Sequence, residues 1–165
     1  MSIILGARSL ARLIGVHPDL VRVVKRAALM ARSTEDFTVL EGVRSDQDAY
    51  ANWGKGRTVA QLAAKGVPAS YAKPKLAKVT WLSNPLSTKH RKQKDGFGHA
   101  VDLAPFPVDW SLTPSNMARF DRMAKLLFAA AEIESVEIRW GADWDGDGKP
   151  REKGEGDSPH FELVI

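Results

Sequence analysis

The chain has 165 residues, enough for one domain with a buried core, and 44% of them are hydrophobic and 27% charged. It contains no cysteine, which excludes disulfides, thiolate metal sites and cysteine nucleophiles. A net charge of +4 suits an anionic partner without choosing one. No apolar run approaches the ~20 residues of a membrane span, and the N-terminus lacks a secretory signal pattern. We therefore expect a soluble protein made in the cytoplasm without a signal peptide.

The first third of the chain mixes helical and strand patterns. A short helix is predicted over 7–14, and apolar residues at helical spacing predict a core helix over about 18–32. His17 directly precedes the Pro and Asp that open this helix, so we interpret it as a cap or surface residue. The β-rich segment 37–43 predicts a strand, and the polar segment 46–53 predicts a helix.

The next segment, 54–80, is rich in Gly, Lys and Pro and predicts a mobile basic loop with one helical patch at 59–64. Such a loop either carries a binding function or is a solvated excursion, and both interpretations stay open. A short strand is predicted at 79–82.

The second half contains two predicted strands that carry polar side chains. In the strand 99–103, alternation places His99 on the face of Val101 and places Asp102 on the opposite face. In the strand 160–165, it places His160 and Glu162 opposite the apolar face, which we expect to consist of Phe161, Leu163 and Ile165. Between these strands the sequence predicts a second long core helix that starts at Thr113-Pro114, followed by a strand at 136–140.

Three residues of these segments are candidate metal ligands. His90, Asp102 and His160 supply nitrogen and oxygen donors of the type that zinc takes, and three protein ligands leave a fourth position open for water. Asp157, three residues before His160, is a candidate general base for that water. Arg44, at the end of a predicted core strand, either faces a cleft or pairs on the surface with Asp46 or Asp48.

A second candidate metal site lies in an acidic turn. Asp143, Asp145 and Asp147 alternate and end in Gly148, as at the start of a calcium loop. The twelfth position is Gly154 rather than Glu, so the EF-hand pattern fails. Bound calcium and a plain acidic turn remain alternatives.

Four blocks of the sequence resemble, in order, the motifs of one enzyme family. They are Gly42-Val-Arg-Ser, the segment from His90 to Gly98-His-Ala-Val-Asp-Leu, Trp140-Gly-Ala-Asp-Trp, and Asp157-Ser-Pro-His-Phe-Glu-Leu. The family is that of the zinc D-alanyl-D-alanine carboxypeptidases, VanX/VanY-like enzymes and phage L-alanyl-D-glutamate endolysins. The blocks cover about residues 37–165, and the small chain is most similar to the phage endolysin branch.

This resemblance implies a fold, a site and a mechanism. The fold would be α+β (the LAS-type metallopeptidase fold), with a small antiparallel sheet that carries one zinc ion and is packed by two longer helices. His90, Asp102 and His160 would be the ligands, Asp157 would stand where the family usually has a catalytic Glu, and Arg44 would steady the carbonyl oxygen in the transition state. We expect residues 1–165 to form a single peptidoglycan peptidase domain, with N-terminal helices within 7–32.

The spacing of the first ligand departs from the family. The family commonly places this His closer to the Asp, and the extra residues within 91–95 of this chain would form a longer turn. The usual spacing lands on Asp95, which is therefore the rival ligand, and His99 is a further alternative. We prefer His90, because it keeps the Thr88-Lys-His pattern and because a neutral imidazole suits zinc better.

The function expected from this resemblance is that of a zinc-dependent phage endolysin that hydrolyses a stem-peptide bond of bacterial peptidoglycan, in particular L-alanyl-D-glutamate. Such a chain would act as a monomer, without a nucleic-acid or stable membrane partner, and would need a separate holin-like protein to reach the cell wall. Trp81, Trp110 and Trp144 are candidate rim contacts, with core packing expected for at least one. The alternatives are a D-alanyl-D-alanine carboxypeptidase and a non-catalytic basic module that binds cell wall.

Overall fold

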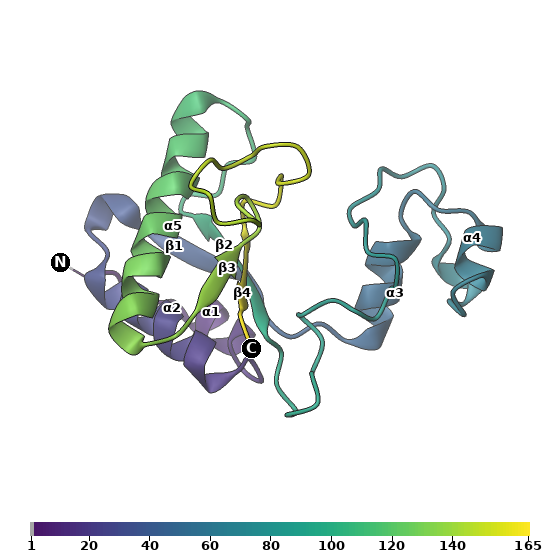
Figure 1. Cartoon of the computed structure of the whole chain (residues 1–165), viewed down its shortest axis with the longest axis horizontal. Helices are drawn as coiled ribbons and strands as arrows, with labels where there is room; N and C mark the ends of the chain where they lie inside the picture. Colours follow the sequence, from purple (N-terminus) through teal and green to yellow (C-terminus); the bar gives the residue numbers. More distant parts are fainter. Residues whose placement is uncertain (1) are drawn as a thin grey trace.

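The fold is a small antiparallel sheet covered on one face by helices, seen in a computed structural model that describes residues 2–165 (Figure 1). The strand order is β1-β2-β4-β3. The strands are β1 Phe37–Glu41, β2 Ala100–Pro105, β3 Ile138–Trp140 and β4 His160–Leu163. The helices are α1 Ala7–Arg12, α2 Pro18–Met30, α3 Asp46–Gly54, α4 Val59–Ala63 and α5 Pro114–Glu134, with 3-10 turns η1 Ser33–Glu35 and η2 Ala69–Tyr71. This architecture confirms the expected α+β class.

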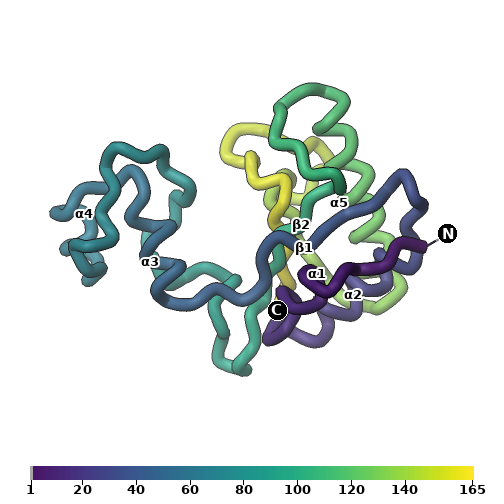
Figure 2. The backbone as a smooth tube through the Cα atoms, turned by 180° about the vertical axis from the view of Figure 1, so that it is seen from behind, coloured from purple at the N-terminus to yellow at the C-terminus, as the bar shows by residue number. Residues whose placement is uncertain are grey.

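The two longer helices form where apolar periodicity and capping residues coincide. His17 caps α2, its side chain accepting a hydrogen bond from the backbone N–H of Asp19, and Thr113 caps α5 in the same way through Asn116. The two helices pack against each other and against the sheet, as Figures 1 and 2 show. Along the chain described, no helix is both long and apolar enough to cross a membrane.

The main core lies between these helices and one face of the sheet. Alternation along the strands sends Val101 and Leu103 of β2, and Phe161 and Leu163 of β4, into this core, where each is at most 2% exposed. The opposite face of the sheet therefore presents the intervening polar side chains. Ile165, expected in the core, is instead 73% exposed because β4 ends at Leu163.

Helices α3 and α4 form a lobe beside this body (Figures 1 and 2). The lobe has a small core of its own, made by Trp53, Leu62 and Val67. It holds the predicted basic segment, which is anchored by the buried Arg57, whose guanidinium donates to the carbonyls of Trp53 and Thr80. The prediction of a strand at 79–82 was wrong: within residues 2–165, this segment pairs with no strand of the sheet.

Candidate active site

The polar face of the sheet brings together the three residues predicted as metal ligands. His90 Nε2 lies 3.2 Å from Asp102 Oδ1 and 3.2 Å from His160 Nδ1, and the latter two atoms are 3.3 Å apart. These donor atoms form a nearly equilateral triangle. The side chains are largely buried, at 2% exposure for His90, 20% for Asp102 and 9% for His160.

Each of these side chains is held by regular structure. Asp102 in β2 and His160 at the start of β4 are direct partners across the antiparallel pair, which places their side chains on the same face. His90 lies outside the sheet and is fixed to the chain that leaves β1, where its carbonyl accepts a hydrogen bond from the backbone N–H of Arg44. Segments far apart in sequence therefore converge at one point.

The second nitrogen of each imidazole has its own partner. His90 Nδ1 lies 2.8 Å from the carbonyl oxygen of Gly42, and His160 Nε2 lies 3.0 Å from Glu162 Oε2. Because both partners accept hydrogen bonds, each ring donates from that nitrogen, which leaves His90 Nε2 and His160 Nδ1 as the nitrogens that face the triangle and can ligate a metal. Glu162 was predictable from alternation along β4, whereas the Gly42 carbonyl had no sequence signal.

The electrostatics of the triangle favour a positive charge at its centre. Burial alone would lower the pKa of His160, but hydrogen bonds to Asp102 and Glu162 outweigh it and raise that pKa to about 9. Burial likewise opposes the charged form of Asp102, yet the two imidazoles hold its pKa far below the usual range.

A zinc ion fits this arrangement. Four ligands at about 2.0–2.1 Å in a tetrahedron lie about 3.3 Å from one another, which matches the separations of the three donor atoms. Two imidazoles and a carboxylate are also a donor set that zinc accepts, and they leave a fourth position open.

Asp157 lies beside this triangle on the loop that enters β4. Gly141 allows the close approach of that loop, because a Cβ at Gly141 would lie 2.5 Å from the Asp157 carbonyl oxygen and 3.0 Å from His160 Cβ. Asp157 is exposed at the surface, yet protein atoms surround much of its carboxyl group. This loss of hydration raises the pKa of Asp157, and the negative charge of Asp102 adds to the rise.

Arg44 faces the same site rather than the outer surface. Its Nε and Nη2 donate to the two carboxylate oxygens of Glu41 at 2.7 and 2.6 Å, and Nη2 lies 4.0 Å from Asp102 Oδ2. The surface pairing with Asp46 or Asp48, left open by the sequence, does not occur. A bulge between Val39 and Glu41 sets Glu41 opposite Asp102 and so aims the Arg44–Glu41 pair at the site.

The rival ligands lie elsewhere. Asp95 Oδ2 is 2.7 Å from His99 Nε2, and these two residues gather with His17 in a separate cluster. The prediction that His99 points away from Asp102 along β2 is confirmed by this placement.

The carboxylates of the acidic turn do not form the set that the sequence suggested. Asp147 pairs with Lys149, whereas Asp143 and Asp145 lie near Glu155. Glu155 is not at a position that the calcium-loop pattern singles out. The prediction of calcium at Asp143, Asp145 and Asp147 is therefore not supported.

The tryptophans are placed differently from one another. The Trp144 ring lies 5.4 Å from the His160 ring and is half-buried, so it borders the site. Trp81 and Trp110 are 78% and 60% exposed, so the expected core packing of at least one of the three was wrong.

A small antiparallel sheet packed by helices is the fold of the LAS-type metallopeptidases, the class expected from the sequence. Comparison with known proteins agrees. The chain is similar to the L-alanyl-D-glutamate peptidase of Escherichia phage T5, with 26% identity over 170 residues, covering 99% of this chain and 100% of the relative.

Two solved structures share the fold. The Serratia marcescens L-Ala D-Glu endopeptidase ChiX superimposes with a TM-score of 0.55 at 25% identity, covering 96% of this chain and 87% of that one. The vancomycin resistance D,D-pentapeptidase VanY, solved as an E175A mutant in complex with Zn(II), gives a TM-score of 0.51 at 16% identity over 91% of this chain and 73% of that one.

The family model of the phage L-alanyl-D-glutamate peptidases matches residues 1–70 and 72–164, and the chain belongs to this family. The expected resemblance to the phage endolysin branch and the expectation of a peptidase are both confirmed. The match also includes the N-terminal helices, beyond the 37–165 covered by the sequence motifs.

Proposed function

We propose that the protein is a zinc-dependent peptidoglycan peptidase that hydrolyses the L-alanyl-D-glutamate bond of the stem peptide. The observation that carries this proposal is the triangle of His90 Nε2, Asp102 Oδ1 and His160 Nδ1, with sides of 3.2–3.3 Å. Family membership and the names of the T5 and ChiX relatives support the choice of bond. The zinc in the VanY structure supports the choice of metal.

His90, Asp102 and His160 would hold the zinc ion. When bound there, zinc supplies Lewis acidity, which lowers the pKa of water and polarises a carbonyl group. The Gly42 carbonyl and the Glu162 carboxylate keep the two imidazoles in the tautomer and orientation that the metal requires.

Asp157 acts as the general base. Its carboxylate takes a proton from the attacking water and then delivers it to the amine nitrogen that leaves when the peptide bond breaks. The raised pKa of Asp157 suits this second step, because a carboxyl group that holds its proton more firmly is a better match for a donor near neutral pH. The shorter Asp side chain reaches the water because Gly141 lets its loop approach the triangle.

Arg44 stabilises the negative charge that develops on the carbonyl oxygen of the substrate. The ion pair with Glu41 engages Nε and Nη2, and among residues 2–165 Nη1 makes no hydrogen bond. Glu41 therefore orients the guanidinium and leaves one nitrogen for the oxyanion, as a preorganised donor requires.

The remaining expectations are part of the same proposal. We propose that residues 1–165 act as a single monomeric peptidase domain on the cell wall after a separate holin-like protein has permeabilised the membrane. The segment 54–80 has five lysines and one arginine but no acidic residue, which suits attraction to anionic wall polymers.

The test combines metal analysis with product analysis. Purified protein is assayed on peptidoglycan before chelation, after chelation and after zinc is restored, and the products are identified by mass spectrometry. New alanine C-termini and D-glutamate N-termini that depend on zinc would support the proposal. Release of terminal D-alanine would instead identify a carboxypeptidase, and wall binding with no product would identify a non-catalytic module.

A further inference from the structure

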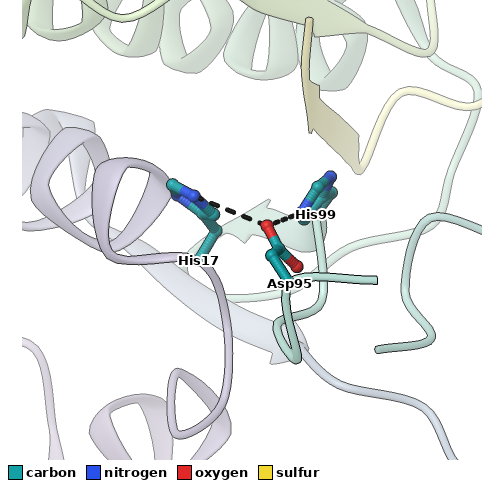
Figure 3. Close-up of side chains that lie close together, drawn as sticks. All are labelled: His17, Asp95 and His99. Carbon is teal, nitrogen blue, oxygen red and sulfur yellow. Dashed lines mark hydrogen bonds and ion pairs between the residues drawn. The ribbon is translucent and has the colours of Figure 1, made fainter. Parts of the chain in front are cut away.

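We propose that His17, Asp95 and His99 form a second zinc site, separate from the catalytic triangle and independent of the proposed function. The three side chains converge from different parts of the chain: the start of α2, the turn after His90 and the residue before β2 (Figure 3). One potential donor atom from each residue lies within 4.8 Å of the other two. Two imidazoles and a carboxylate are the same donor types that the triangle uses.

The separations suit a bound ion. Asp95 Oδ2 lies 2.7 Å from His99 Nε2 and 3.8 Å from His17 Nε2 (Figure 3). Ligand atoms around a tetrahedral zinc lie about 3.3 Å apart. The two distances from Asp95 bracket this value, and the donor nitrogens of the two imidazoles lie within 4.8 Å of each other.

The local structure presents the Asp95 carboxylate to both rings. Its Oδ1 accepts a hydrogen bond from the backbone N–H of Phe97, which closes a turn and directs Oδ2 at the imidazoles. The turn itself is braced by a hydrogen bond from the Gln93 N–H to the Phe97 carbonyl.

The two histidines are held by backbone pairing. The His17 N–H donates to the Gly98 carbonyl at 2.8 Å, and the Gly98 N–H donates to Gly15, so the start of α2 is tied to the residue before His99. The His99 N–H donates to the Lys89 carbonyl at 2.7 Å. Backbone support of this kind confines the rearrangement on ion binding to the side chains, which favours affinity.

The imidazoles have the surroundings that a metal ligand needs. His17 Nδ1 accepts the backbone N–H of Asp19 as the cap of α2, so a metal at Nε2 requires the proton to move to Nδ1, where the Asp19 carboxylate at 3.8 Å can accept it in place of the cap. His99 is buried, its Nδ1 has no partner among residues 2–165, and its ring hydrogen bond points at Asp95. Exposure of 39% for Asp95 and 20% for His17 leaves a path for the ion and a position for water.

A metal here would fix the turn that connects two catalytic ligands. The turn runs from His90 to Asp102, and the extra residues that lengthen it include Asp95. Zinc bound to Asp95, His99 and His17 would join this turn to α2. It would therefore stabilise the folded chain in proportion to zinc occupancy.

The experiment measures zinc stoichiometry with full-length protein, by titration calorimetry and elemental analysis. Wild type is expected to bind two zinc ions per chain, and His160→Gln, which disables the triangle, is expected to bind one. His17→Gln and Asp95→Asn should each bind one, and Asp95→Asn combined with His160→Gln should bind none. Glu132→Gln removes an exposed carboxylate on α5 and serves as the matched control. It should still bind two zinc ions per chain.

A readout independent of activity locates the ion. In the His160→Gln protein, zinc should shift the imidazole ¹⁵N resonances of His17 and His99 and raise the thermal unfolding midpoint, and Asp95→Asn should remove both effects. Circular dichroism identifies any variant that fails to fold. One zinc in wild type, no zinc in His160→Gln, or a second zinc that survives both His17→Gln and Asp95→Asn would overturn the proposal.

Discussion

His90 Nε2 and His160 Nδ1 face each other at 3.2 Å, because the other nitrogen of each ring faces an acceptor. Two lone pairs at this distance repel unless a cation stands between them. In the absence of metal, a proton on His160 meets this need, and the hydrogen bonds of His160 to Asp102 and Glu162, which outweigh its burial, raise its pKa. Zinc and that proton therefore compete for His160 Nδ1.

The first prediction concerns the pH dependence of stability without metal. The pKa of His160 is about 9 in the folded chain and about 6.5 when unfolded, so its protonation stabilises the fold fully below pH 6.5. This contribution, on the order of 3 kcal/mol, is lost as pH rises through 9. Urea unfolding of chelator-treated protein at pH 6 and pH 9.5 measures the loss. Zinc-loaded protein is the control and should lose less, since metal replaces the proton.

The second prediction separates base from ligand. Asp157→Asn should lower kcat by at least about 10²-fold, because the amide cannot accept the proton of water. Zinc affinity should stay near the wild-type value, since Asp157 is not part of the triangle. Peptidoglycan turnover and zinc titration on the same sample give the comparison. Undiminished turnover would remove Asp157 from the role of base.

The third prediction concerns the Arg44–Glu41 pair. Arg44→Ala should lower kcat by about 10²–10³-fold with zinc still bound, because a donor to the oxyanion is lost. Glu41→Gln keeps the cation but weakens the pairing that orients it, so a smaller loss of kcat is expected. Steady-state kinetics of both variants provides the test, and an undiminished kcat in Arg44→Ala would remove Arg44 from the oxyanion role.

The fourth prediction rests on the close approach at Gly141. Gly141→Ala adds a Cβ 2.5 Å from the Asp157 carbonyl oxygen and 2.9 Å from its Cβ, so the loop must move away from the triangle. We expect a loss of stability of about 1–3 kcal/mol. Activity should fall by about 10²-fold, because a base displaced by an ångström is poorly placed. Gly146→Ala probes the strain of a positive φ where a Cβ meets no neighbour, and it should leave activity near wild type.

The fifth prediction tests the separate core of the α3–α4 lobe. Leu62 is fully buried there, so Leu62→Ala should destabilise the lobe by about 2–5 kcal/mol. Hydrogen exchange should accelerate within α3 and α4 while α2 and α5 stay protected. Acceleration throughout the chain would show that the lobe and the main body unfold as one unit.

Short-range signals explain what was predicted correctly. The cap residues His17 and Thr113 and the apolar periodicity of α2 and α5 act within a few turns of chain, so the sequence alone locates both helices. Period-2 alternation correctly assigns Asp102 to the open face of the sheet and Phe161 to the core. The ligand set was deduced from residue types and from family motifs.

The contacts that define the chemistry were decided by tertiary structure. The Gly42 carbonyl behind His90 and the pairing of Arg44 with Glu41 depend on how β1 and the turn at His90 meet, which no local pattern encodes. The absent strand at 79–82 has the same cause, since a strand requires a partner as well as β propensity.

The sequence by itself thus determined the helices, the strand faces and the donor types, because these follow from neighbours along the chain. Only the tertiary structure decided which donors meet. It placed His90 with Asp102 and His160, and it turned Asp95 and His99 away toward His17. The physical reason is that a metal site is a set of distances between remote segments, and these distances are fixed by sheet pairing and core packing.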